Sequence, residues 1–355
     1  MSAMAPFVFG GLRSRVVFAR GAIERTGEEI DRLGRSRALV LSTPAQADDA
    51  EALAGRLGER AAGVFTGATM HTPVEVTEAA LAVFNDLGAD CVVSFGGGST
   101  IGLGKAIAVR TGADQIAIPT TYAGSEMTDI LGETQGGEKT TRRDPAILPE
   151  TVIYDVDLTL GLPVGMSATS GLNALAHAAE ALYAVDRNPI ITLMAGEAVR
   201  ALTAGLPGVV AAPLDRAARS KAQYGAWLCG ACLGSSSMAL HHKLCHVLGG
   251  SFNLAHAETH SVMLPHTVGF NAFAAPELLA PIEEALGASA GIALHRFAAG
   301  LGAPTRLSDI GLRRGDIATA ADIAMRNPYA NPRPFSRDDI VHILENAYAG
   351  TTPPY

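Results

Sequence analysis

Residues 91–110 read CVVSFGGGSTIGLGKAIAVR. The first five residues predict a buried strand and residues 100–110 predict a helix, so a glycine run joins a strand directly to a helix. Glycines let the backbone approach an anion closely, and a helix start offers unpaired N–H groups and the positive end of the helix dipole. The stretch therefore predicts a cradle for a pyrophosphate group, formed by Gly96, Gly97, Gly98 and Ser99.

Outward from this stretch, short apolar runs alternate with segments of helical spacing. The other runs lie at residues 15–19, 37–42, 63–65, 115–118 and 151–154. This alternation predicts a parallel sheet with helices on both faces, in which ligands bind at the carboxyl ends of the strands. Between the last two strands, ILGETQGGEKTTRR predicts a hairpin that turns at Gly136 and Gly137.

The pattern changes near residue 160. Helical spacing then covers residues 167–183, 190–206, 214–233, 239–248, 275–286, 292–301 and 314–325. We therefore expect an α/β dinucleotide-binding domain at residues 1–160 and an all-α domain at residues 161–355.

Composition limits the classes of partner. The formal net charge is −8 and no basic run is present, which argues against a nucleic-acid partner or an anionic membrane surface. No uninterrupted apolar stretch approaches eighteen residues and the N-terminus lacks a signal-peptide layout, so we expect a soluble, cytoplasmic protein. The four cysteines are too few for a disulfide framework, and the pair Cys229 and Cys232 is interpreted as helix packing. An edge strand near the N-terminus would permit a homodimer.

Half of the ten histidines fall in residues 238–260, MALHHKLCHVLGGSFNLAHAETH. They are His241, His242, His246, His256 and His260. His242 and His246 share one helical face, and we expect the helix to stop at Gly249 and Gly250 before His256 returns. Such a cluster is typical of a metal site or of acid–base chemistry. The alternative is a set of half-buried, hydrogen-bonded histidines without chemistry.

Further candidate residues lie at the ends of two other strands and on one other helix. At the end of the strand at residues 115–118, Thr120 and Thr121 could line the same crevice as the glycines, or could simply cap the strand. Where an acidic residue commonly holds the ribose and repels the 2′-phosphate of NADPH, this chain has Thr43, so we expect it to accept both NADH and NADPH. Asn173 and His177, four apart, share a helix face that could meet the histidine cluster.

The motifs GGGSTIGLGKA, IPTTYAGSEMT, SGLNALAHAAEA and HHKLCHVLGGSFNLAHAETH together resemble the iron-containing alcohol dehydrogenase superfamily, whose fold is similar to that of dehydroquinate synthase. The resemblance covers nearly the whole chain. Asn173 and Gly102, where metal-dependent members carry Asp, and the segments HHKLCH and NPYANPRP are similar to the maleylacetate reductase branch. That branch implies NADH- or NADPH-dependent reduction of the C=C bond of maleylacetate to 3-oxoadipate, in aromatic-compound degradation.

The resemblance also implies roles for individual residues. Cofactor binding would involve Ser42, Gly96, Gly97, Gly98, Ser99, Thr120, Thr121 and Lys139. The family's metal-ligand positions hold His177, His242 and His256, and His246 stands at its active-site histidine. Because Asn173 removes the only anionic ligand, Fe²⁺ would be held less tightly. Zn²⁺ could still bind three histidines and a water, but we expect that no metal is required.

In this reaction hydride adds to the alkene and negative charge develops as an enolate, which an imidazole can stabilise or protonate. His246 is the first candidate and His242 the second. The substrate carries two carboxylates. Arg333 is the candidate to bind one of them, and Lys243 or Arg143 is the candidate to bind the other. Tyr329 could add a hydrogen bond. Glu126 is interpreted as structural.

Three other functions stay open at this point. They are a metal-dependent alcohol or polyol dehydrogenase of the same superfamily, a lyase of the dehydroquinate synthase type, and a nucleotide-binding protein without turnover. The density of histidines argues against the last of these.

Overall fold

The computed structural model describes residues 6–136 and 138–353, with only the backbone of residues 138 and 139. The chain forms two compact units. One spans Leu12–Leu162, and the other combines Pro163–Tyr355 with the residues up to Gly11.

The first unit is built on a six-stranded parallel sheet. In spatial order the strands are β1 (Arg15–Phe18), β8 (Thr151–Tyr154), β5 (Asp114–Pro119), β4 (Cys91–Gly96), β2 (Ala38–Leu41) and β3 (Ala61–Phe65). The chain moves outward from β2 to β3 and then in the other direction from β4 to β5. The strand order therefore reverses between β2 and β4, and at such a point an open α/β sheet leaves a crevice for a ligand.

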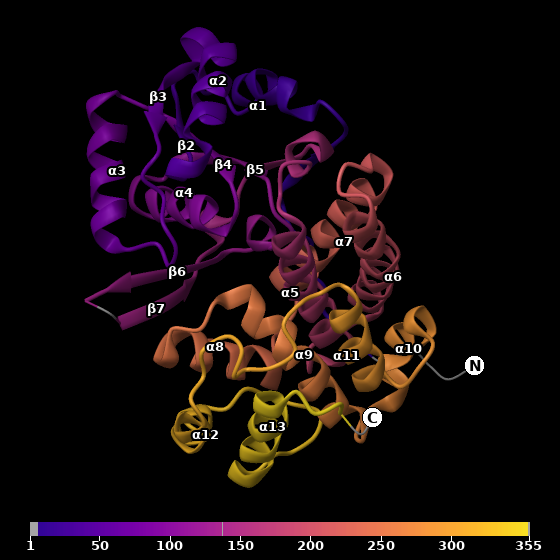
Figure 1. Ribbon diagram of the computed structural model, residues 1–355. Helices are drawn as coiled ribbons and strands as arrows, with labels where there is room; N and C mark the ends of the chain where they lie inside the picture. The colour runs from indigo at the N-terminus through magenta and orange to yellow at the C-terminus, as the bar shows by residue number, and fades with distance from the viewer. Residues whose placement is uncertain (1–5, 137, 354–355) are drawn as a thin grey trace. The chain divides into compact units, whose positions relative to one another are not determined.

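Helices cover both faces of this sheet (Figure 1). Helices α1 (Thr26–Arg32) and α2 (Ala47–Leu57) share a core with one set of strand residues, while α3 (Val74–Asp86) and α4 (Gly98–Thr111) share another with the alternate set. In β2, for example, Val40 packs in the first core and Leu39 in the second. Short 3-10 helices occupy Ala22–Arg25, Pro44–Gln46, Gly58–Arg60, Ser125–Met127, Pro145–Ile147 and Val156–Thr159.

The predicted hairpin is confirmed. Strands β6 (Ile130–Gln135) and β7 (Glu138–Arg143) pair antiparallel, with Gln135 opposite Glu138. Gly136 has a φ of 57°, a conformation that suits glycine at a tight turn. Gly137, the second expected turn residue, lies outside the described residues.

The second unit is helical. Its helices are α5 (Val164–Tyr183), α6 (Pro189–Ala211), α7 (Arg216–Ser235), α8 (Leu240–Phe252), α9 (His256–Ala272), α10 (Ala280–Leu286), α11 (Ala290–Gly300), α12 (Ile317–Ala324) and α13 (Arg337–Ala349), with 3-10 turns at Pro276–Leu279 and Arg314–Asp316. A Cβ added at Gly205 would lie 2.7 Å from the backbone nitrogen of Ala222, so glycine sets the close approach of α6 to α7. Cys229 and Cys232 are buried inside α7, and burial raises the pKa of Cys232 to about 12, as expected for packing residues.

Three details differ from the sequence-based expectation. Helix α8 continues through Gly249 and Gly250 to Phe252, and the C-cap residue Asn253 has a left-handed φ of 55°. Helix α9 was not expected, because it contains Pro265 and is buried on most sides, so it lacks a single apolar stripe. Helix α13 was also missed, although Ser336 forms a capping box at its start.

Helix α6 is long and apolar enough to cross a membrane by length and composition alone. Within its most apolar window, 44% of the residues are buried inside the unit. It packs against α5, α7 and α10, and this arrangement is that of a core helix.

Candidate active site

The glycine run forms a close-packed turn between β4 and α4. Gly96 has a φ of 150°, and a Cβ there would lie 2.5 Å from Oγ1 of Thr100. At Gly97 a Cβ would lie 2.9 Å from Cγ2 of Thr121, whereas Gly98 faces open space. The first two glycines thus bring the chain close to its neighbours, and the third leaves the start of α4 accessible. This arrangement fits the phosphates of a dinucleotide.

The strand ends beside this turn carry further polar groups. Ser42 is buried and its hydroxyl donates to its neighbour's carbonyl, the oxygen of Thr43, at 3.2 Å. Gln46, a residue that the sequence did not single out, donates from Nε2 to Oγ1 of Thr120 at 3.2 Å. Its side chain therefore joins the ends of β2 and β5 across Gly96. The side chain of Lys139 lies outside the described part of the structure, so its predicted role stays a prediction.

A buried ammonium anchors the segment that follows Thr121. Nζ of Lys105 donates to the carbonyls of Ser125 at 2.6 Å and Ile130 at 2.9 Å, and to Oγ1 of Thr128 at 2.9 Å. Burial lowers the pKa of Lys105 to about 7. These bonds hold the loop between β5 and the hairpin against α4. Because α4 begins at the glycine turn, the position of the loop is fixed relative to that turn.

Glu126 lies in the same loop. Burial raises the pKa of its carboxyl group, and the hydroxyl of Tyr154 donates to Oε1 at 2.8 Å. Both groups are buried, which fits the structural interpretation of Glu126.

In the helical unit, a buried carboxylate orients the first pair of histidines. Oε2 of Glu180 lies 2.6 Å from Nδ1 of His242, and the carboxylate also accepts from the backbone N–H groups of Ala239 and His241, both at 2.8 Å. A carboxylate behind a histidine fixes the tautomer and the orientation of the ring. Sequence reasoning assigned no role to Glu180, although its place one turn after His177 on α5 was a usable signal.

His177 completes this pair. Its Nδ1 lies 2.9 Å from Nε2 of His242. With Nδ1 of His242 directed at Glu180, its Nε2 is the ring nitrogen that shares this hydrogen bond with Nδ1 of His177. Both ring nitrogens of His242 are therefore engaged within the protein.

A second chain of hydrogen bonds lies deeper. The hydroxyl of Thr267 donates to the carbonyl of Met263 at 3.0 Å, so it accepts from Nδ1 of His241 at 3.0 Å. Nε2 of His241 then accepts from Nδ1 of His260 at 2.8 Å. Burial, followed by the charges of neighbouring histidines, holds the pKa values of both rings well below the usual range. Nε2 of His260 is consequently a buried lone pair with no partner among the described residues.

A more exposed group surrounds His246, whose ring centre is 6.0 Å from that of His242 on the same helix. Nδ1 of His246 is 3.4 Å from the hydroxyl of Tyr329, and Nζ of Lys243 is 5.5 Å from the centre of the Tyr329 ring. Lys243 also donates to the carbonyl of Arg326 at 2.8 Å, and partial burial lowers its pKa. The structure thus brings together three of the predicted catalytic residues.

Arg333 lies elsewhere. Its guanidinium stacks on the rings of Phe270 and Phe273, at 3.9 and 4.8 Å from their centres, and donates to the carbonyl of Phe270. These aromatic and backbone contacts fix the guanidinium, and the predicted role of Arg333 as a carboxylate receptor stays a prediction. In the α/β unit, Arg143 forms an ion pair with Asp129 at 3.4 Å.

The remaining predicted ligand positions provide neutral donors. Asn173 is buried, and its Oδ1 has no partner among the described residues. His256 is exposed at the start of α9, and its ring centre is 4.5 Å from that of His260. His177, His242 and His256 offer imidazole nitrogens as ligand atoms, and Asn173 offers one amide oxygen. Such a set fits a borderline ion such as Zn²⁺ better than a hard ion.

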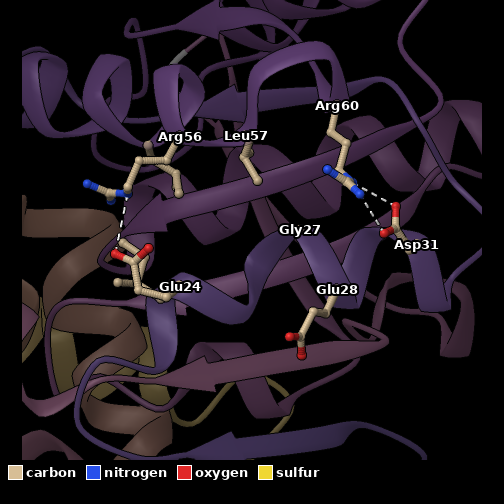
Figure 2. Close-up of a pocket in the computed structure, with 9 residues that line it drawn as sticks. Glu24, Gly27, Glu28, Asp31, Arg56, Leu57 and Arg60 are labelled. Atoms are coloured by element: carbon tan, nitrogen blue, oxygen red, sulfur yellow. Dashed lines mark hydrogen bonds and ion pairs between the residues drawn. The ribbon is translucent and has the colours of Figure 1, made fainter.

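One hollow of the α/β unit lies between α1 and α2, and its lining includes neither the glycine turn nor the polar strand ends. Figure 2 shows Arg60 paired with Asp31 and Arg56 paired with Glu24 at its rim. These charges already have partners of opposite sign, and Leu57 forms part of the wall. The hollow is a gap between two surface helices and does not contribute to the site.

Two family models match the chain in succession. The model described as iron-containing alcohol dehydrogenase matches residues 13–156, and the C-terminal model of the Fe-containing alcohol dehydrogenase family matches residues 167–348. The chain belongs to the iron-containing alcohol dehydrogenase family. The expected family and fold class are thereby confirmed.

Similarity to individual members extends along the whole chain. It is 59% identical over 350 residues to the maleylacetate reductase of Rhizobium sp. strain MTP-10005, covering 99% of this chain and 100% of that one. It is 55% identical over 351 residues to the maleylacetate reductase of Burkholderia cepacia, with the same two coverages. The crystal structure of maleylacetate reductase from Agrobacterium tumefaciens matches with a TM-score of 0.96 at 59% identity, covering 99% of this chain and 100% of that chain.

Proposed function

We propose that the chain is an oxidoreductase that reduces the carbon–carbon double bond of maleylacetate to give 3-oxoadipate, with NADH or NADPH and without a catalytic metal. The observation that carries the proposal is the full-length similarity to maleylacetate reductases. The neutral amide of Asn173 supports the metal-free part, because it supplies no anionic ligand for a hard ion. A metal-dependent alcohol dehydrogenase of the same family is the less favoured alternative.

The glycine turn and the polar strand ends of the α/β unit would hold the nicotinamide cofactor, which supplies the hydride. When hydride adds to the alkene carbon remote from the ketone, charge develops on the ketone oxygen as an enolate, and a hydrogen-bond donor stabilises it. Transfer of one proton to the other alkene carbon then gives the saturated ketone. His246 is the donor we assign, because its ring is exposed beside the Tyr329 hydroxyl. His242 is less suited to contact the substrate, since Glu180 and His177 occupy both of its nitrogens.

The other residues of the helical unit orient and bind. Glu180 holds His242, and His242 in turn fixes the ring of His177. Lys243 lies next to Tyr329 and carries the positive charge that a substrate carboxylate requires. We assign the carboxylate to Lys243 rather than to Arg333, which is stacked on two aromatic rings.

The test is a spectrophotometric assay of NADH oxidation with maleylacetate, run with and without a chelator. The proposal expects equal rates in both. Loss of activity with chelator and recovery with added Fe²⁺ or Zn²⁺ would establish the metal-dependent alternative. An absence of NADH oxidation with any dicarboxylic enone would reject the reductase activity itself.

Replacing His246 with alanine tests the assigned donor. We expect kcat to fall by about 10²–10⁴-fold while the Kd for NADH stays unchanged, because the cofactor groups lie in the other unit. His342, exposed on α13, provides the matched control for loss of an imidazole. Equal losses in kcat and NADH affinity would indicate a structural role.

A cytoplasmic homodimer completes the proposal. Strand β1 lies at the edge of the sheet, where a second copy could pair. The acidic net charge of −8 supports a small-molecule substrate rather than a nucleic acid or membrane. Light scattering of the purified protein measures the number of subunits.

A further inference from the structure

The segment that carries Tyr329 has no regular structure of its own. It is the strap, residues 326–333 (RNPYANPR), which lies between α12 and α13. In the described part of the chain, no backbone-to-backbone hydrogen bond involves residues 327–335, and Pro328 and Pro332 have no N–H group to donate. Side-chain contacts must therefore hold the strap in place.

Asn331 supplies most of these contacts and uses its whole side-chain amide to do so. Its Oδ1 accepts from Nδ2 of Asn271 at 3.0 Å and from the backbone N–H of Leu240 at 3.5 Å. Its Nδ2 donates to Oδ1 of Asn271 at 2.6 Å and to the carbonyl of Arg333 at 2.7 Å. Two protons and two lone pairs are all engaged, so the orientation of the amide is fixed by its partners. Because Asn271 is buried on α9, these bonds fix the strap to that helix.

A second contact fixes the other side of Tyr329. Nζ of Lys243 donates to the carbonyl of Arg326 at 2.8 Å, so Tyr329 lies between two held positions of the strap. Its hydroxyl is 3.4 Å from Nδ1 of His246. A displacement of the strap by roughly 0.2 Å away from α8 would end this contact, because a separation of about 3.6 Å is no longer a hydrogen bond.

The start of α8 has support that does not depend on Asn331. The backbone N–H groups of Ala239 and His241 both donate to Glu180 at 2.8 Å, whereas that of Leu240 lies 3.5 Å from Oδ1 of Asn331. Loss of the Asn331 amide should therefore release the strap and leave α8 in place.

We infer that Asn331 positions Tyr329 for the proposed reaction by fixing the strap to α9. It is a positioning residue, because its bonds go to α8, to α9 and to the strap itself, and its effect on His246 passes through Tyr329. The inference rests on the proposed function, in which His246 donates to the enolate. A group that acts through the Tyr329 hydroxyl cannot cost more than removal of that hydroxyl.

A double-mutant cycle between Asn331→Ala and Tyr329→Phe tests this inference, with kcat measured for NADH and maleylacetate. Asn331→Ala should lower kcat by up to about 10²-fold, the cost of a misplacement of about 1 Å, and by no more than Tyr329→Phe does. In the Tyr329→Phe background it should lower kcat by less than about twofold, and the Kd for NADH should stay unchanged. The inference is overturned if Asn331→Ala has no effect, or if its full loss persists in the Tyr329→Phe background, as a general structural role would require.

Asn346→Ala is the matched control, because Nδ2 of Asn346 pairs with His342 on α13 and not with the strap, and it should leave kcat unchanged. If Asn331→Ala does not fold, Asn331→Asp takes its place in the cycle, since it keeps the two accepted hydrogen bonds and loses the two donated ones.

A measurement without turnover separates this inference from the proposed function. In protein labelled with fluorotyrosine, the ¹⁹F resonance of Tyr329 is identified by its loss in Tyr329→Phe. It should shift in Asn331→Ala and stay unchanged in Asn346→Ala. An unmodified protein that oxidises no NADH refutes the proposed function, whereas a Tyr329 resonance that is the same in Asn331→Ala refutes the positioning by Asn331.

Discussion

Acid should destabilise this protein through His266. The ring is 5% exposed on α9, its Nε2 has no partner among the described residues, and burial lowers its pKa from 6.5 to about 3. In the unfolded chain the same side chain regains its ordinary pKa. Between the two values the unfolded state binds more protons than the folded state, so the free energy of unfolding falls as pH falls.

The size of the effect follows from the two pKa values. The stability that comes from burying His266 in its neutral form is fully present above pH ~6.5. It is lost progressively as pH falls toward the folded pKa of about 3. At pH ~5 the loss from this single group is about 2 kcal/mol. His241 and His260 have pKa values lowered in the same direction, so their losses add to it.

Urea unfolding followed by circular dichroism at pH 7.5 and 5.0 measures this difference. In His266→Gln the difference between the two pH values should shrink by about 2 kcal/mol, whatever the constant cost of the substitution. His342→Gln is the control, because it removes an exposed imidazole from α13 and leaves the buried rings in place. An unchanged difference in His266→Gln would refute the reasoning.

Three further outcomes are expected. Gly97→Ala should raise the Kd for NADH at least several-fold, because the new methyl group would lie 2.9 Å from Thr121; fluorescence titration measures it, and an unchanged Kd contradicts the cradle. Tyr329→Phe should lower kcat with little change in NADH affinity, because it removes the hydroxyl beside His246, and steady-state kinetics with a separate binding titration decide. Glu180→Gln should cost about 1–3 kcal/mol of stability, since an amide cannot accept from all three donors; an unchanged urea midpoint would contradict this.

Local sequence determined most of the α/β unit. Strand β4, its glycine turn and α4 are contiguous, and each has a pattern that depends only on neighbouring residues: an apolar run, three glycines and a helical period. The hairpin was predictable for the same reason, since its turn joins two adjacent strands. Helix α9 was not, because a helix buried on most sides has no polar face to reveal its period.

The sequence also determined that histidines gather on α8 and at the start of α9, because spacing of four on a helix fixes a shared face. Only the tertiary structure decided which nitrogens meet. Glu180 on α5 reaches His242, and Thr267 on α9 reaches His241, through contacts between residues 62 and 26 positions apart. Sequence spacing cannot predict such contacts, because they depend on how helices pack against one another. This packing placed Arg333 on two aromatic rings, and it left Nε2 of His260 without a hydrogen-bond partner among the residues that the structure describes.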